Sequence, residues 1–298
     1  MCKLKSKVKQ GTGMKLGINT FIYELGKITI LESIKKISSL GFKYVDFVPF
    51  GSLHPDNITR KLTNDLTKIM QDLGLHSSQM LLLNTRNLTT SEPGERKIIL
   101  DYLKRITDFQ LLIGGKQVLI CWGQGIIPAN MLWEQAWVNS VYLIRDFAEW
   151  AHTQKLLISL ELDPGVYFLN NNLHKMLKII EDIDMPNVFS NIDVSHLNIT
   201  RESPNKLEKL RNKIIHIHIS DCDGLDHTNS ILGTGTTDIA SYMNKLSELR
   251  VEDVAMKYGE QAVAAIELGD PGITVDDPDR WVKDSIKYLS RYLPSLDM

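Results

Sequence analysis

The chain has 298 residues, of which 43% are hydrophobic and 23% charged, and 34 basic against 36 acidic side chains give a formal net charge of −2. This composition is that of a folded globular protein and excludes collagen-like, coiled-coil and disordered chains. A charge near zero disfavours a nucleic-acid partner, because phosphate binding requires an excess of Lys and Arg. The sequence has no apolar stretch that approaches the ~20 residues of a membrane span. We therefore expect a soluble protein with neither a nucleic-acid nor a membrane partner.

The three cysteines, Cys2, Cys121 and Cys222, are an odd number and show no CxxC spacing. Such usage is typical of reduced thiols and indicates a cytoplasmic protein. Residues 1–13 contain four lysines and no acidic residue, and no apolar segment of a secretory signal follows them. We expect residues 1–13 to be a flexible basic tail and residues 14–298 to be one catalytic domain.

Eight short apolar runs, bounded by polar residues, Gly or Pro, follow one another along the chain. In order they are Leu16–Phe21, Tyr44–Phe50, His76–Leu83, Gln117–Gly123, Leu156–Leu162, Val188–Val194, Ile214–Ser220 and Ala262–Leu268. Their length and their Val, Ile and Leu content predict strands that are buried on both faces of a parallel sheet. Successive runs start about 35 residues apart on average, which leaves room for one strand and one crossover helix in each unit.

The intervals between the runs show helical periodicity. In Leu31–Leu40 apolar residues recur every third position and Gly41 follows as a helix stop, and Thr59–Leu73 is followed by Gly74 in the same way. The other predicted helices are 95–113, 131–152, 172–183, 239–250 and 278–292, with a brief one over 206–211. Eight alternating units without a Pro- or Ser-rich linker predict a single α/β domain, a (β/α)₈ TIM barrel, rather than two doubly wound domains.

Titratable side chains stand at the ends of the last four predicted strands, where a parallel barrel places its active site. They are Glu161, Asp193, His218 and Glu267. A single buried acid is more often half of a structural ion pair, but four such groups on consecutive strands favour one shared divalent cation. Three carboxylates with one imidazole form a hard donor set, which favours Mn²⁺ and leaves Mg²⁺, Co²⁺ and Zn²⁺ as alternatives.

With these residues the chain resembles the xylose isomerase-like sugar isomerase/epimerase family, and within it the ketose 3-epimerase (tagatose/psicose epimerase) branch. The resemblance spans residues 14–292. Its motifs are Glu161, Asp193-Val-Ser-His196, His216-Ile-His218-Ile-Ser-Asp221, Gly233-Thr-Gly235 and Glu267. The resemblance implies that Glu161, Asp193, His218 and Glu267 bind the metal and that the substrate is a small carbohydrate. It also implies a homo-oligomer, a dimer or a tetramer.

The resemblance implies epimerisation next to a ketose carbonyl by proton transfer through an enediolate. Epimerisation requires an acid and a base on opposite faces of a planar intermediate, and Glu161 and Glu267 are the candidates for these two catalytic roles. His196 matches a position that contacts a sugar oxygen in the epimerases.

Four further residues complete the predicted substrate-binding set. Trp122, at the end of the fourth strand, is expected to form an apolar wall, and Asp221 and Asp223 lie in an acidic loop that is either a recognition loop or a solvated turn. His216 shares a strand face with His218 but lies further from the mouth of the barrel. We place it in the substrate-binding set rather than among the metal ligands, and a supporting role in packing remains the alternative.

Two positions depart from the epimerase pattern. Tyr167 and Gly224 stand where the epimerases have a Glu and often an Arg that serve the substrate. These changes keep open a lyase-type cleavage of 3-keto sugars or glycosides at the same metal. Two more distant alternatives are an apurinic endonuclease-like repair enzyme, which would need more metal ligands and a basic face, and a non-catalytic barrel subunit.

Overall fold

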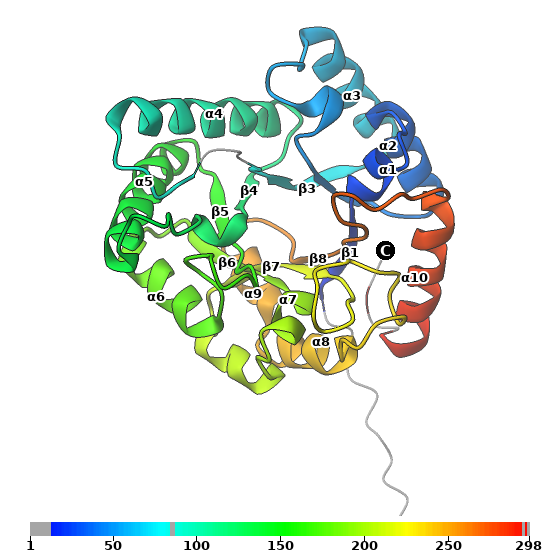
Figure 1. Cartoon of the computed structure of the whole chain (residues 1–298). Helices are drawn as coiled ribbons and strands as arrows, with labels where there is room; N and C mark the ends of the chain where they lie inside the picture. Colours follow the sequence, from blue (N-terminus) through cyan, green and yellow to red (C-terminus); the bar gives the residue numbers. More distant parts are fainter. Residues whose placement is uncertain (1–12, 84–86, 294–295, 297–298) are drawn as a thin grey trace, which may run out of the picture.

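The computed structural model describes residues 13–83, 87–293 and 296, which form a ring of helices around a central barrel of strands (Figure 1). The predicted basic tail, apart from Gly13, lies outside the described residues. The helices of this part of the chain include none that is long and apolar enough to cross a membrane.

Eight parallel strands close on themselves in sequence order. They are β1 (Lys15–Asn19), β2 (Tyr44–Phe47), β3 (His76–Leu81), β4 (Gln117–Ile120), β5 (Leu157–Leu160), β6 (Val188–Asp193), β7 (Ile214–Ile219) and β8 (Val263–Ile266). The last strand pairs with the first, with Leu16 opposite Ala264. The prediction of a single (β/α)₈ TIM barrel is confirmed.

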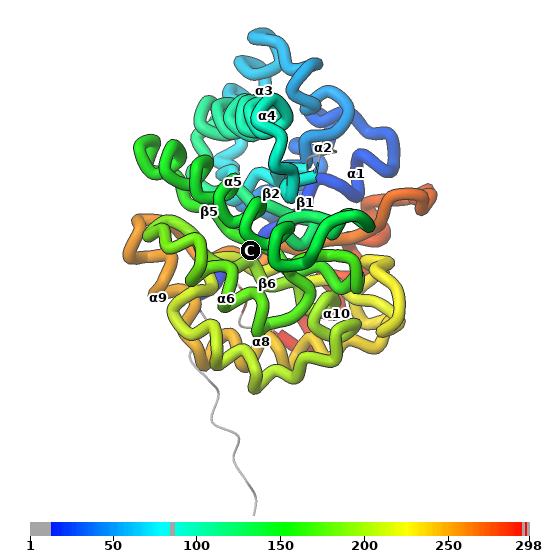
Figure 2. Tube along the Cα trace, turned by 60° about the vertical axis from the view of Figure 1, so that its left-hand side comes forward, coloured from blue at the N-terminus to red at the C-terminus, as the bar shows by residue number. Residues whose placement is uncertain are grey.

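The helices cover the outside of the barrel, and the tube in Figure 2 follows them around it. The longer helices are α2 (Ile30–Ser39), α3 (Arg60–Leu73), α4 (Pro93–Leu112), α5 (Trp133–Thr153), α6 (Leu173–Ile183), α8 (Ile239–Glu248) and α10 (Pro278–Tyr292). The short ones are α1 (Phe21–Leu25), α7 (Val194–Ile199) and α9 (Val251–Met256), with 3₁₀ turns η1 (Gly51–Leu53), η2 (Trp122–Gln124) and η3 (Pro204–Leu210).

The interior of the barrel contains buried polar side chains, and the main apolar core lies between the strands and the helices. In β7 the side chains of Ile215, Ile217 and Ile219 belong by alternation to one face, and His216 and His218 to the other. All five are fully buried. Because the isoleucine face meets the helices, the histidine face must point into the barrel. The polar side chains of β7 therefore face the axis of the barrel.

The strands end earlier than the apolar runs that predicted them. β2 ends at Phe47 and β4 at Ile120, whereas the runs continue to Phe50 and Gly123. The residues beyond the strand ends are apolar because several of them, Val48 and Cys121 included, form a second small hydrophobic cluster, separate from the main core. The apolar residues that follow the strand ends thus belong to a second apolar cluster at the barrel mouth.

Candidate active site

The four predicted metal ligands converge at the carboxyl ends of β5 to β8. Glu161 directly follows β5, Asp193 is the last residue of β6, His218 lies in β7, and Glu267 directly follows β8. One ligand atom from each of the four lies within 4.8 Å of the others. The side chain of His218 is fully buried, and those of Glu161 and Glu267 are 6% and 12% exposed. The barrel thus gathers residues that are more than 100 positions apart in sequence.

The imidazole of His218 stands between the two glutamates. Its Nδ1 is 3.0 Å from Oε1 of Glu161 and 2.8 Å from Oε2 of Glu267. Each glutamate is oriented by a neutral amide, since Asn191 donates to Oε1 of Glu161 at 2.6 Å and Asn19 donates to Oε1 of Glu267 at 3.2 Å. The ligand side chains are therefore held in place by the barrel itself.

The two carboxylate oxygens of Asp193 differ in their contacts. Oδ1 accepts hydrogen bonds from the backbone N–H and the hydroxyl of Ser195, from the N–H of His196 and from the hydroxyl of Ser220. Oδ2 is buried and has no hydrogen-bond partner among the described residues. A buried carboxylate oxygen that belongs to the cluster and has no such partner is what a cation would satisfy.

The charge balance also favours a cation. Burial by itself would lower the pKa of His218, but Glu267 and Glu161 raise it well above its usual value. Burial would raise the pKa of Asp193, yet His196, His227 and His218 bring it down to about 2. Three carboxylates beside one imidazole leave a net negative site, and a donor set of oxygen atoms and one nitrogen fits a hard or borderline divalent ion.

A cavity of about 520 Å³ opens at the mouth of the barrel beside these residues. Glu161 and Glu267 form part of its lining. Much of the apolar side of the cavity comes from the first half of the chain and includes Phe21, Phe50, Leu81, Leu83 and Trp122. Its volume lies in the range of small-molecule sites, ~300–1,000 Å³.

Two histidines with similar contacts, His196 and His227, line the polar side of the cavity. Nδ1 of His196 lies 2.7 Å from the carbonyl oxygen of Leu162, and Nδ1 of His227 lies 3.2 Å from Oδ1 of Asp270. Nε2 of both rings has no partner among the described residues, and the ring centroids are 4.4 Å apart. Burial would lower the pKa of His227, but Asp270 and nearby carboxylates raise it to about 9. These rings can offer N–H or lone-pair contacts to a polar ligand.

Not every predicted site residue reaches this cavity. His196 and Trp122 line it, whereas Asp221, Asp223 and His216 are absent from its described lining. The buried carboxylate of Asp221 accepts backbone N–H groups from 222, 233, 235 and 237, and Asp223 accepts those of 225 and 226. His216 is fully buried inside the barrel. Asp221 and Asp223 thus bind the backbone of their own loop, and His216 contacts Asp46 inside the barrel.

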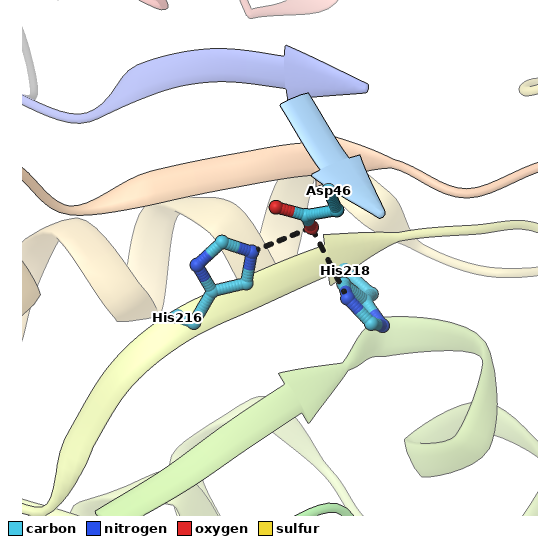
Figure 3. Close-up of side chains that lie close together, drawn as sticks. All are labelled: Asp46, His216 and His218. Carbon is cyan, nitrogen blue, oxygen red and sulfur yellow. Dashed lines mark hydrogen bonds and ion pairs between the residues drawn. The ribbon is translucent and has the colours of Figure 1, made fainter. Parts of the chain in front are cut away.

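Sequence reasoning missed His227, Asp270 and Asp46. Asp270 follows the eighth apolar run by two residues, and Asp46 is a carboxylate inside an otherwise apolar run, Tyr44–Phe50, so each left a signal in the sequence. His227 lies in a loop whose path no periodicity predicts. Asp46 is fully buried and contacts His216 at the centre of the barrel (Figure 3).

Together these observations define a TIM barrel with four residues at the carboxyl ends of its strands that could hold a metal ion. The chain belongs to the xylose isomerase-like TIM barrel family, whose sequence model matches residues 34–292. It is similar to an L-ribulose 3-epimerase from Methylomonas sp. (strain DH-1), with 26% identity over 211 residues, 68% of this chain and 70% of the relative.

Solved structures agree on the fold. A D-tagatose 3-epimerase-like protein superimposes with a TM-score of 0.77 at 21% identity, covering 94% of this chain and 97% of the other. The IolI protein, whose structure holds a zinc atom, superimposes with a TM-score of 0.74 at 19% identity, covering 94% and 99%. The resemblance to sugar isomerases and epimerases is confirmed at the level of the family.

Proposed function

We propose that the protein is a divalent-metal-dependent sugar epimerase or isomerase that acts on the carbon next to a ketose carbonyl. The observation that carries the proposal is that Glu161 and Glu267 both approach Nδ1 of His218 and both line one cavity. Two carboxyl groups at one cavity can supply the base and the acid that inversion of a carbon centre requires. The similarity to an L-ribulose 3-epimerase supports the same reaction class.

The residues divide the chemistry among them. Glu161, Asp193, His218 and Glu267 would hold the cation, which when bound polarises a carbonyl and stabilises the charge that develops on its oxygen. One glutamate removes the proton from the carbon next to the carbonyl, and the resulting enediolate is planar at that carbon. The other glutamate enters the step as a carboxylic acid and delivers its proton, from the opposite face for epimerisation, so that it ends as a carboxylate while the first glutamate keeps the proton it removed. Asn191 and Asn19 keep the two carboxylates in position.

The sugar would lie between the two sides of the cavity. Trp122 offers a surface for its carbon face, and Nε2 of His196 and of His227 faces its oxygens. We assign Asp221, Asp223 and His216 to support of these elements. Mn²⁺ is the first metal to test, followed by Mg²⁺, Co²⁺ and Zn²⁺, and cytoplasmic location and a dimer or tetramer complete the proposal.

The direct test is solvent exchange. The Mn²⁺-loaded protein is incubated with a panel of ketoses in D₂O, and product and recovered substrate are analysed by NMR. We expect deuterium at the inverted carbon, and we expect Glu161→Gln and Glu267→Gln each to reduce turnover at least ~10²-fold, because each removes a group that transfers a proton. Glu202→Gln, at a buried acid whose carboxylate accepts from the N–H of Leu173, is the control. Turnover without deuterium uptake would refute the mechanism.

Cleavage of 3-keto glycosides at the same site is the second candidate. The observation that favours it is Tyr167, which is 54% exposed and lines the cavity where the epimerases carry a substrate-binding Glu. A phenol and the apolar side of the cavity suit a substituent larger than a free ketose. Running 3-keto glucosides beside the ketoses, with detection of the released aglycone, separates the two reactions.

A further inference from the structure

A carboxylate that is not a metal ligand lies inside the barrel next to the ligand cluster. Asp46 projects from β2 toward β7, and its Oδ2 lies 2.8 Å from Nε2 of His216 and 3.4 Å from Nε2 of His218 (Figure 3). Its Oδ1 accepts a hydrogen bond of 2.6 Å from the hydroxyl of Ser78. The side chains of Asp46 and both histidines are 0% exposed, so water does not compete for these contacts.

The position of Asp46 determines what His218 can offer to a cation. A neutral imidazole has one N–H and one lone pair. A cation held together with Glu161 and Glu267 would take the lone pair of Nδ1, which leaves the ring N–H on Nε2, 3.4 Å from the carboxylate of Asp46. Nδ1 is the atom that lies 3.0 Å and 2.8 Å from Glu161 and Glu267.

We propose that Asp46 is a positioning residue that fixes the ring orientation and the tautomer of His218 so that Nδ1 faces the cation. Metal-binding histidines commonly donate their other ring N–H to a carboxylate or a carbonyl, which holds the ring and increases its basicity. The inference rests on the proposed metal site, and it adds a residue that touches neither metal nor substrate.

The same geometry explains why two histidines alternate in β7. His216 donates from Nε2 to the oxygen of Asp46 that faces His218, and its ring stands at 90° to that of His218 with centroids 5.6 Å apart. His216 therefore positions the carboxylate of Asp46 and does not itself bind the cation. The H-x-H motif then has one ligand, His218, and one residue that supports the ligand's partner.

The test compares metal binding by four folded proteins. Mn²⁺ affinity is measured by isothermal titration for the wild type, Asp46→Ala, Asp46→Asn and Ser77→Ala. We expect Asp46→Ala to raise the Kd for Mn²⁺ by 10–100-fold, the range for loss of such outer partners. Asp46→Asn keeps an acceptor without the charge and should fall between. Ser77→Ala is the matched control, because Ser77 precedes Ser78, the donor to Asp46, in the neighbouring strand β3 but itself donates to Gln110.

A spectrum separates positioning from general destabilisation. Co²⁺ bound to the wild type and to Asp46→Asn should differ in the energy and intensity of the visible bands, since these report the ligand field, and Ser77→Ala should match the wild type. If folded Asp46 variants bind Mn²⁺ with wild-type affinity and give the wild-type Co²⁺ spectrum, the inference is wrong. If the wild type itself binds no divalent ion, the proposed function fails instead.

Discussion

At the scale of the residue, Asp193 performs two tasks with two oxygens. Oδ1 caps α7 by accepting the N–H groups of Ser195 and His196, while Oδ2 is left without a partner. Asn is as good an N-cap as Asp, so Asp193→Asn should keep the cap while it removes the charge that a cation needs. We predict that the apo variant unfolds within a few degrees of wild type but loses Mn²⁺ binding, as measured by calorimetry and isothermal titration.

A second variant at the same position separates the N-cap role of Asp193 from its role as a metal ligand. Asp193→Ala removes the cap and the ligand together, and loss of a cap costs about 1 kcal/mol. We expect it to unfold at a lower temperature than Asp193→Asn and to bind no metal. Equal stability of the two variants would show that Oδ1 does not cap the helix, and Mn²⁺ binding by Asp193→Asn would remove Asp193 from the ligand set.

The sequence placed some of the candidate site residues well and others poorly, for a physical reason. Glu161, Asp193, His218 and Glu267 could be proposed because each interrupts an apolar run near its end, where a barrel strand meets its mouth. Asp46 is also inside such a run, but its role depends on β2 facing β7 across the barrel. That juxtaposition is set by the closure of the sheet, which local sequence does not encode.

At the scale of the element, one buried carboxylate organises the long loop after β7. Asp221 accepts backbone N–H groups from Gly233 and Gly235 at 2.9 Å each, which ties this segment to the end of the strand. A Cβ atom on Gly235 would overlap the carbonyl oxygen of Cys222 and the carboxylate of Asp221. The Gly-Thr-Gly motif is therefore required by close approach of the backbone.

We predict that Gly235→Ala loosens this loop and leaves the barrel folded. The added methyl group must displace Asp221 or the backbone of 222, so at least one of the hydrogen bonds is lost, at about 1 kcal/mol each. Limited proteolysis should cut between 223 and 237 faster than in wild type. Gly74→Ala is an informative comparison, because its Cβ meets nothing within 4 Å, although its φ of +64° favours glycine. Unchanged proteolysis of Gly235→Ala would contradict the assigned role of Asp221.

A second prediction at this scale concerns the contact between η3 and α8. Arg211 and Lys245 hydrogen-bond Glu208 and lower its pKa to about 2. A lowered acid pKa stabilises the fold above the ordinary value near 4.5 and loses this effect as pH falls toward 2. The unfolding temperature of Glu208→Gln should therefore lie below that of wild type at about pH 6, and the gap should narrow by about pH 3. Because the side chains of Glu208 and Arg211 are about half exposed, the effect is small and should shrink with salt.

The strands were predicted more accurately at their starts than at their ends. Each strand begins within one residue of the predicted run, because a buried parallel strand needs an uninterrupted apolar stretch. The short helices α7 and α9 were not predicted, since six residues are too few to show a helical period. The start of α7 is instead set by the side chain of Asp193, which is the N-cap of the helix.

At the scale of the whole molecule, the ligand cluster joins four neighbouring strands at the barrel mouth. Without a cation, the like charges of Glu161, Asp193 and Glu267 repel one another in a buried site, and burial of such groups is unfavourable. A cation that binds the folded barrel but not the unfolded chain stabilises it by about 2.7 kcal/mol at a concentration one hundred times its Kd. Metal binding and global stability should therefore be coupled.

We predict that Mn²⁺ raises the unfolding temperature of the wild-type protein in a concentration-dependent way and that a chelator reverses the change. A differential scanning calorimetry series over Mn²⁺ concentration measures it, and Asp193→Asn should show no shift, because it lacks the anionic ligand that bridges cation and α7. An unfolding temperature independent of every divalent ion tested would show that the carboxylates are paired within the protein and not through a metal.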